Sequence, residues 1–249
     1  MKRRGVEQIS YFQVDNPLVR IIDPVFLGLH VGAGGGENAS SGEMSSKMIP
    51  KAYAEEKLGV FCLADGKLDV IEYSDMPAAL SKETNAEGAL RFNAGSIAIH
   101  CISVEFVERL NNDPKFSLPY HRAEKKIPAI DPQTGAPVTP EKNNGVKLER
   151  FVFDALPRAR ASIVLETVRE EEFAPIKNAT GVDSVVSSKD LQVRRAARWL
   201  TSAGAQVPMK DGGAPDCVLE LSPLTALEPE DLKGKVEGLR IERGMEVAV

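Results

Sequence analysis

The sequence has few cysteines and no long apolar run. It contains three cysteines among 249 residues, at the widely separated positions Cys62, Cys101 and Cys217. An odd, unclustered set argues against a disulfide framework or a zinc site and predicts reduced thiols. Nowhere do about 18 apolar residues follow one another, so we expect no membrane span. The Met-Lys-Arg-Arg start does not lead into an apolar segment suited to secretion, which predicts a cytoplasmic protein.

An excess of positive charge is also missing. The chain has 31 Lys and Arg against 36 Asp and Glu, a formal net charge of -5, and both signs are scattered along it. A surface that binds nucleic acid must neutralise many phosphates, so this balance argues against a nucleic-acid partner. It remains compatible with a small basic pocket for one nucleotide or sugar phosphate.

Familiar catalytic and metal-binding motifs are absent from the sequence. It has no Gly-x-Ser-x-Gly, Cys-x-x-Cys or His-Glu-x-x-His pattern. The three histidines, His30, His100 and His121, are too dispersed to suggest a metal cluster, and His100 is predicted to be a hydrogen-bonded interior residue. The glycine-rich stretch 32–43 lacks the preceding strand and the Lys-Ser/Thr end of a phosphate-binding loop, so it predicts a plain loop.

Segments typical of strands and of helices alternate along the chain. Strand patterns cover residues 9–14, 59–64, 67–73, 90–93, 151–154 and 162–168, and helix patterns cover 21–31, 77–82, 97–110 and 190–203. The Asp65-Gly66 pair between two strand patterns favours a tight hairpin. Together they predict an α/β fold with a mixed, largely parallel sheet flanked by helices and at least one antiparallel hairpin.

Two composition changes indicate how the chain is divided. Residues 111–146 are rich in Pro, Asn, Lys and Gly, which predicts an excursion over the surface. After Val207 the hydrophobic periodicity weakens. We therefore predict one main domain over 1–206 and a small C-terminal subdomain or arm over 207–249.

Polar side chains follow several of the predicted strands. They occur at Asp15-Asn16, at 72–75 and at 93–96. Ligands of open α/β sheets gather at the carboxyl ends of strands, where a carboxylate can hold Mg²⁺ and an amide can bond a sugar hydroxyl. Each segment also fits an ordinary turn or connection, and the residue pattern alone leaves both interpretations open.

Several segments together resemble the UDP-N-acetylglucosamine pyrophosphorylase family, which belongs to the wider UDP-sugar pyrophosphorylases. The resemblance is carried, in the family's order, by residues 13–18, 46–51, 56–61, 70–75, 92–100, 121–128, 145–154, 171–178 and 220–224. It implies a fold like that of the nucleotide-diphospho-sugar transferases, with 1–206 as the C-terminal part of the catalytic domain.

The resemblance also implies an activity. Family members condense UTP with N-acetylglucosamine 1-phosphate and release pyrophosphate in a Mg²⁺-dependent reaction, in which the protein mainly positions the reactants and stabilises phosphate charge. Catalytic roles fall on Lys177, which would place its ammonium on the phosphates, and on Asp15, which would lie near the metal and the phosphates.

The resemblance assigns further residues to the sugar. Gly59, Glu72 and Asn93 would line the sugar site, and Phe151 and Phe153 would form an apolar wall near the N-acetyl group. Glycine at position 59 would let the backbone approach the sugar, and the Glu72 carboxylate could accept hydrogen bonds from hydroxyls.

Two departures from the family pattern bear on function. Ser96 stands where the family has a sugar-contacting asparagine, which leaves the sugar substrate open. The family's glycine-rich nucleotide loop belongs to an N-terminal half, so we expect this chain to be the sugar-binding half. Turnover is expected only if the missing half is supplied by a separately encoded chain or by a longer native protein. The alternatives are a non-catalytic fragment that binds a UDP-sugar or sugar phosphate, and a pyrophosphorylase for UDP-glucose or for a broad set of UDP-sugars.

Overall fold

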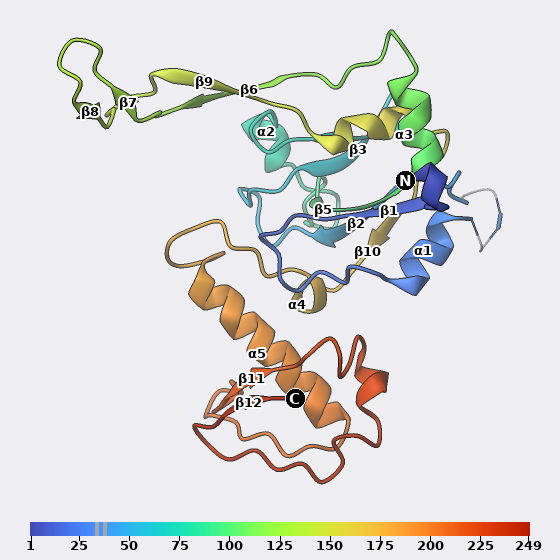
Figure 1. The fold of residues 1–249 in the computed structure, drawn as a ribbon, viewed down its shortest axis with the longest axis vertical. Helices are drawn as coiled ribbons and strands as arrows, with labels where there is room; N and C mark the ends of the chain where they lie inside the picture. The colour runs from blue at the N-terminus through green and yellow to red at the C-terminus, as the bar shows by residue number, and fades with distance from the viewer. Residues whose placement is uncertain (33–34, 37–38) are drawn as a thin grey trace.

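The computed structural model describes residues 1–32, 35–36 and 39–249 (Figure 1). A six-stranded sheet with its helices forms the main body, and a smaller body built on one long helix lies at the C-terminal end. Part of the predicted glycine-rich loop, residues 33–34 and 37–38, lies outside the described residues.

The central sheet is mixed, as predicted. Its strand order is β10-β2-β5-β3-β4, with β1 also paired to β5. The strands are β1 (Gln8–Tyr11), β2 (Met44–Pro50), β3 (Val60–Ala64), β4 (Lys67–Ile71), β5 (Ala94–Ser103) and β10 (Val164–Glu166). The α/β fold with a mixed sheet is confirmed. The balance of strand directions differs from the expected one: β10 pairs with β2 in parallel, and the other pairings described in this sheet are antiparallel. Short connections such as the β3–β4 turn can join only antiparallel neighbours.

Local sequence signals explain two of the elements closely. Asp65 and Gly66 have φ angles of 50° and 76° and join β3 to β4 in the predicted hairpin. Helix α1 (Pro24–His30) lies within the helix predicted over 21–31. It begins at Pro24, because the Asp23 carboxylate accepts hydrogen bonds from the amides of Val25 and Phe26.

The other helices are short, with one exception. They are α2 (Ala78–Ser81), α3 (Val104–Asn111), α4 (Arg169–Glu172) and the long α5 (Val185–Ser202), with 3₁₀ turns η1 (Lys2–Arg4), η2 (Val152–Arg158) and η3 (Pro229–Leu232). A capping box between Ser184 and Ser187 starts α5.

Three predicted elements are wrong. The segment 90–93, predicted as strand, forms only an isolated bridge between Leu90 and Thr84, and β5 begins after it at Ala94. The helix expected over 97–110 is strand up to Ser103, and α3 begins only at Val104, where the Ser103 hydroxyl accepts a hydrogen bond from the Phe106 amide. Strand β5 lies inside the sheet and is buried along most of its length, so its continuous apolar run does not distinguish strand from helix. The strand pattern at 151–154 runs into the 3₁₀ helix η2, which buries Phe153 and Leu156 three positions apart.

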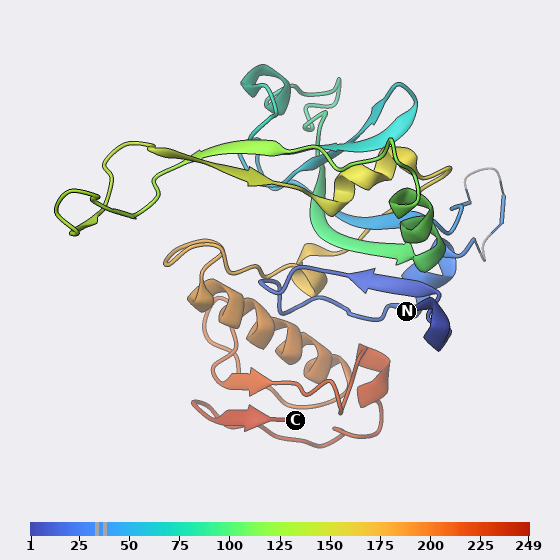
Figure 2. The ribbon, with the colours of Figure 1, turned by 45° about the horizontal axis from the view of Figure 1, so that its top comes forward.

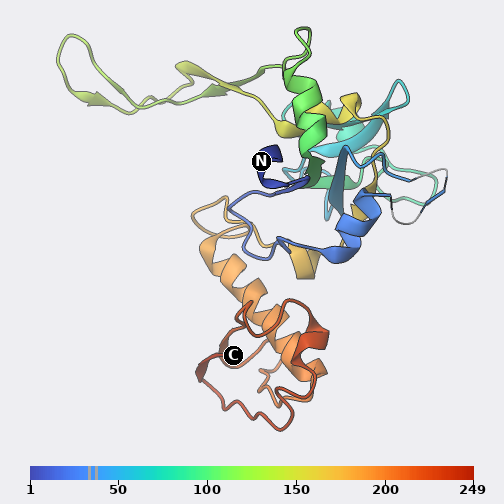
Figure 3. The same cartoon turned by 45° about the vertical axis from the view of Figure 1, so that its right-hand side comes forward.

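The predicted surface excursion forms a long two-stranded arm. It consists of β6 (His121–Lys125) paired with β9 (Gly145–Glu149) and of the short pair β7 (Ala129–Ile130) and β8 (Pro137–Val138). The arm extends away from the main body in the views of Figures 1 and 3.

The C-terminal body packs the long helix α5 against two short parallel strands, β11 (Val218–Glu220) and β12 (Glu246–Ala248) (Figure 2). Its hydrophobic cluster joins Trp199 and Leu200 of α5 to Leu219, Leu232 and Ile241. The cluster therefore includes residues on both sides of position 206, and the predicted domain boundary there stays a prediction.

Two further clusters lie against the central sheet. One contains Met44, Phe61, Ile102, Phe106 and Leu156, and the other contains Phe26, Ile49, Leu58, Ile97 and Phe173. As predicted, all three cysteines are free thiols, and His100 is buried with its Nδ1 2.8 Å from the Ser46 hydroxyl. Among the described residues, no helix is both long and apolar enough to cross a membrane.

Candidate functional site

One pocket of about 330 Å³ brings most of the predicted site residues together. Its lining contains seven of the eight, namely Asp15, Gly59, Glu72, Ser96, Phe151, Phe153 and Lys177. They come from the segment after β1, from the positions just before β3 and just after β4, from β5, from the start of η2 and from the loop between α4 and α5. The tertiary structure thus gathers residues that the sequence spreads over 163 positions, counted from 15 to 177 inclusive.

Asn93 is the predicted residue that does not line this pocket. Its carbonyl oxygen accepts hydrogen bonds from the Lys51 and Gly95 amides, each 2.8 Å away. These contacts fix the start of β5, the strand that carries Ser96. The assignment of the Asn93 side chain to the sugar stays a prediction.

Gly59 lies at a close approach between two pocket segments. A Cβ atom at this position would lie 2.7 Å from Glu72 Oε2 and 2.8 Å from a Val70 methyl carbon, so no other residue fits without displacing them. The Gly59 carbonyl also accepts a 2.7 Å hydrogen bond from the Ser96 amide. Gly59 therefore sets the positions of both Glu72 and Ser96.

The environment of Glu72 favours its protonated form. Burial raises the pKa of this carboxyl, and the nearby charge of Asp75 raises it further, while Lys177 and His121 act in the opposite direction. A carboxyl group with few solvent contacts at the wall of a pocket is suited to exchange hydrogen bonds with a hydroxylated ligand.

A backbone irregularity lies beside Ser96. Ala98 has a φ angle of 54°, which is uncommon for a residue with a side chain, and it lines the pocket within β5. The register between β2 and β5 shifts at the same level, between Ser46 and Met48. Such bulges redirect side chains near functional sites, and no residue pattern predicted this one.

A backbone hydrogen bond joins the segment that carries Asp15 to the segment that carries Lys177. The Ile176 amide donates a 2.9 Å hydrogen bond to the Asp15 carbonyl, and the Lys177 amide donates a 2.7 Å hydrogen bond to the Asp183 carbonyl. The exposed Lys177 side chain has its ammonium 5.6 Å from the centre of the Phe173 ring. An ammonium and a carboxylate thus lie on one side of the pocket.

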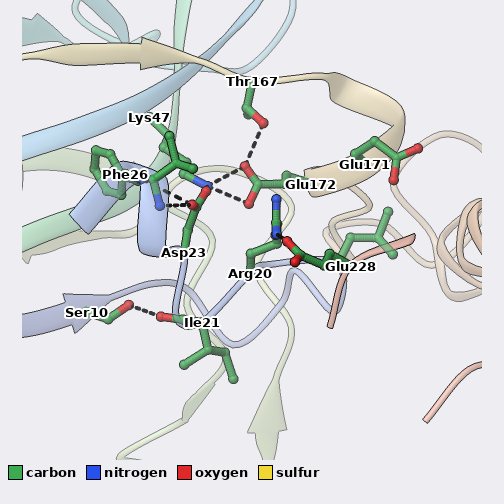
Figure 4. A network of polar contacts seen from close by, with 12 residues as sticks. Ser10, Arg20, Ile21, Asp23, Phe26, Lys47, Thr167, Glu171, Glu172 and Glu228 are labelled. Carbon is green, nitrogen blue, oxygen red and sulfur yellow. Dashed lines mark hydrogen bonds and ion pairs between the residues drawn. The ribbon is translucent and has the colours of Figure 1, made fainter. Parts of the chain in front are cut away.

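A buried ion network, which the residue pattern did not reveal, supports this side (Figure 4). The Lys47 ammonium, 1% exposed, donates to Asp23 Oδ2 at 2.6 Å and to both Glu172 oxygens at 2.6 and 2.7 Å. Thr167 donates a further 2.6 Å hydrogen bond to Glu172. Burial alone would raise the pKa of Asp23, but the hydrogen bonds from Lys47 and the Phe26 amide outweigh it and lower the pKa.

Asn16 connects that network to the pocket. Its side-chain amide donates to the Glu172 carbonyl at 2.7 Å, and its oxygen accepts from the Ala174 amide at 3.0 Å. Asn16 follows Asp15, and Ala174 precedes Lys177 by three residues. These bonds therefore hold the segment that carries Asp15 beside the segment that carries Lys177. The sequence had marked Asn16 only as part of a strand-end pair.

Aromatic rings form another wall of the pocket. Phe151 and Phe153 are stacked, with ring centres 4.9 Å apart and planes at 15°. The predicted strand alternation is wrong here, yet both rings still line the pocket as the resemblance implied. The wall offers a flat apolar surface opposite polar groups.

The donor set limits what metal the chain could hold. Among residues 1–32, 35–36 and 39–249, no group of three or more His, Cys, Asp or Glu gathers around a common point. Asp15 supplies one carboxylate in the pocket, beside the amide side chains of Gln13 and Asn178. This set fits Mg²⁺ held by one carboxylate with phosphate and water oxygens completing the shell.

Comparison with known proteins identifies the family of the chain. The sequence model of the family described as "UTP--glucose-1-phosphate uridylyltransferase" matches residues 1–208, most of the chain. The chain belongs to this family. The resemblance seen in the sequence is therefore confirmed.

Two of the relatives that the chain matches are named for N-acetylated sugars. The chain is 36% identical over 252 residues to the human "UDP-N-acetylhexosamine pyrophosphorylase-like protein 1", covering 96% of this chain and 48% of that protein. It is 35% identical over 241 residues to the "UDP-N-acetylglucosamine pyrophosphorylase" of Saccharomyces cerevisiae, covering 94% and 48%. The chain spans about half the length of the curated relatives that it matches.

A solved structure extends the likeness to three dimensions. The uridine diphosphate N-acetylglucosamine pyrophosphorylase of Trypanosoma brucei, crystallised with an inhibitor, superposes with a TM-score of 0.73 at 26% identity. The match covers 97% of this chain and 50% of that one. The fold described above is thus that of the family.

Proposed function

We propose that this chain forms the sugar-phosphate side of a uridylyltransferase site that makes UDP-N-acetylglucosamine and pyrophosphate from UTP and N-acetylglucosamine 1-phosphate. The observation that carries the proposal is the single pocket that unites Asp15, Glu72, Lys177 and the stacked phenylalanines. The names of the relatives support the choice of sugar.

The reaction requires positioning more than covalent chemistry. A phosphate oxygen of the sugar 1-phosphate forms a bond to the α-phosphorus of UTP, and the bond from that phosphorus to the departing pyrophosphate oxygen breaks. Lys177 would place a point charge on the phosphates, and the bond from the Ile176 amide to the Asp15 carbonyl would hold the backbone segment of Asp15 beside that of Lys177. Holding the two reactants in line supplies much of the rate.

Opposite groups of the pocket would recognise the sugar. Glu72 would bond its hydroxyls, while Phe151 and Phe153 would pack against the methyl of the N-acetyl group. Ser96, shorter than the family's asparagine, leaves space that a bridging water can fill.

Magnesium is the cofactor that we propose for this site, with Asp15 as its protein ligand. A single carboxylate ligand suits an ion that takes most of its other oxygen ligands from phosphates and water. When bound, Mg²⁺ would neutralise phosphate charge.

The test combines binding and turnover. Calorimetry with N-acetylglucosamine 1-phosphate and UDP-N-acetylglucosamine measures affinity for the chain, and pyrophosphate release is followed with UTP, Mg²⁺ and a panel of sugar 1-phosphates. The assay is run on the chain alone and with a segment that carries the family's glycine-rich nucleotide loop. We expect saturable binding in both and turnover when that segment is present. Folded protein that binds none of these ligands would refute the proposal.

Two observations favour alternatives that the same assay separates. The sugar-side groups Glu72, Phe151 and Phe153 of the pocket also suit a module that binds a UDP-sugar without turnover. Ser96 in place of asparagine favours UDP-glucose or a broader set of sugars. Binding without pyrophosphate release in either sample indicates the first, and equal rates with glucose 1-phosphate indicate the second.

A further inference from the structure

His121 lies directly behind the aromatic wall of the pocket. It is the first residue of β6, at the base of the arm, and it is not among the residues that line the pocket. Its ring packs on Phe151 with ring centres 4.8 Å apart, and the centre of Phe153 is 6.3 Å away. His121 therefore packs against the aromatic wall without lining the pocket itself.

Both ring nitrogens of His121 face carboxylates. Nδ1 lies 3.2 Å from Asp75 Oδ2, and Nε2 lies 3.0 Å from Asp154 Oδ2. A neutral imidazole has one N–H, whereas carboxylates at neutral pH only accept, so both contacts are hydrogen bonds only when the ring is protonated. The arrangement therefore favours the protonated, imidazolium form of His121.

The two carboxylates lie on segments that form different walls of the pocket. Asp75 follows β4 and is tied to Glu72 by a 2.9 Å bond from its amide to the Glu72 carbonyl. Asp154 lies in η2, directly after Phe153. The protonated ring therefore joins the segment of the sugar-bonding carboxylate to the segment of the aromatic wall.

We propose that His121 is a positioning residue that sets the pocket's preference for N-acetylated sugar phosphates by clamping the aromatic wall to the segment that carries Glu72. The inference rests on the proposed function, because it assigns the N-acetyl group to Phe151 and Phe153. A glucose 1-phosphate, which has a hydroxyl at that position, gains little from a fixed apolar wall.

The charge of the clamp depends on pH. Burial of the ring lowers the pKa of His121, but the hydrogen bonds and charges of Asp154 and Asp75 outweigh it and raise the pKa above 6.5. Two other carboxylates face this region: Glu72 interacts with the ring through its charge, and Glu149 lies opposite His121 in the β6–β9 register. Because the folded pKa is raised, the clamp is complete below 6.5 and is lost as the pH rises through the folded pKa.

The test compares His121→Gln with Arg122→Gln on the full chain. Arg122 is the next residue on the same strand, is exposed, and pairs only with Glu124 among the described residues, so its variant makes a similar cation-to-amide change away from the pocket. Calorimetry at pH 6 measures dissociation constants for N-acetylglucosamine 1-phosphate and glucose 1-phosphate. We expect His121→Gln to weaken the first about tenfold, the loss of roughly one charged hydrogen bond, and the second less than about twofold. Arg122→Gln should change neither.

A second variant and a ligand-free measurement protect the test from misfolding. Asp75 is 54% exposed, so Asp75→Asn should fold normally. The His121 ring proton, followed by NMR, should titrate above 6.5 in the wild type and at a lower pH in Asp75→Asn. The other two histidines are distinguishable, because burial lowers the pKa of His30 and lowers that of His100 to about 4. The wild-type preference for the N-acetylated ligand should decline over the same pH range as the titration.

The outcomes separate the two proposals. A wild type that binds neither sugar phosphate overturns the proposed function and this inference with it. Binding with an unchanged preference in His121→Gln, or a His121 titration at or below 6.5 that Asp75→Asn does not move, overturns this inference alone.

Discussion

At the scale of single residues, the pocket contains positions where the packing excludes other residues and positions where a substitution leaves the packing unchanged. Gly59 is of the first kind, because its neighbours occupy the space of a Cβ atom. Lys177 is of the second kind, because its side chain is exposed and its fold contacts are made by the backbone. Substitutions at the two positions should therefore act through different mechanisms.

Replacing Lys177 by alanine should reduce turnover by roughly 100-fold or more, since it removes the charge placed on the phosphates. The thermal unfolding midpoint should stay nearly unchanged, because within the described part of the chain the exposed Lys177 side chain makes no hydrogen bond, only the ring contact with Phe173. Lys189→Ala is the control: Lys189 is also exposed but lies on α5, and its variant should retain activity. Full pyrophosphate release in Lys177→Ala would contradict the phosphate role.

Replacing Gly59 by alanine should weaken sugar-phosphate binding by displacing Glu72, whose Oε2 would lie 2.7 Å from the new methyl. Gly28→Ala in α1 is the matched control, because nothing lies within 4 Å of its Cβ position. Alanine there should stabilise the helix by about 0.5–1 kcal/mol and leave binding intact. Equal affinity in the two variants, measured by calorimetry, would show that Gly59 does not position Glu72.

At the scale of elements, short segments far apart in sequence are fixed by polar contacts more than by their own propensities. Helix α4 has four residues and cannot be stable by itself. Its Glu172 binds Lys47 of β2, and its Glu171 accepts hydrogen bonds from Arg198 and Trp199 of α5. It therefore connects the sheet to the C-terminal body immediately before the loop of Lys177.

Breaking the buried pair should have a large effect. Lys47→Met leaves Asp23 and Glu172 buried without their cation and should lower the free energy of unfolding by about 3–5 kcal/mol. Lys82→Met, which removes an ion pair exposed on both sides, should leave the denaturation midpoint nearly unchanged. Similar midpoints for the two variants in urea would mean that the buried network does not hold α4 in place.

At the scale of the whole molecule, the C-terminal body is held by apolar packing of α5 over residues beyond 206. Leu232 is fully buried in that cluster, whereas Leu224 nearby in the chain is 96% exposed. The two leucines offer a direct comparison of buried and exposed sites in one body.

Leu232→Ala should cost about 2–5 kcal/mol of unfolding free energy, because it removes buried methyl groups and leaves a cavity. Leu224→Ala should change stability by less than about 0.5 kcal/mol. Both variants should bind sugar phosphate normally below their melting temperatures, since the pocket lies in the main body. A comparable loss of stability in both, by calorimetry, would show that the cluster does not stabilise this body.

Local signals in the sequence determined several elements, because their causes lie within a few residues. The Asp65-Gly66 turn and the Asp23 cap of α1 are of this kind. The ordered family segments likewise identified seven residues of the pocket. These predictions needed no knowledge of which segments meet.

Only the tertiary structure decided the features that depend on distant segments meeting. The apolar run after position 97 is a strand because neighbouring strands pair with its edges and the hydrophobic clusters of the sheet cover its faces. Lys47 contacts the carboxylates of Asp23 and Glu172, and His121 contacts those of Asp75 and Asp154. No local pattern marks such pairs, because the free energy of a buried charge is set by partners that only the fold brings into contact.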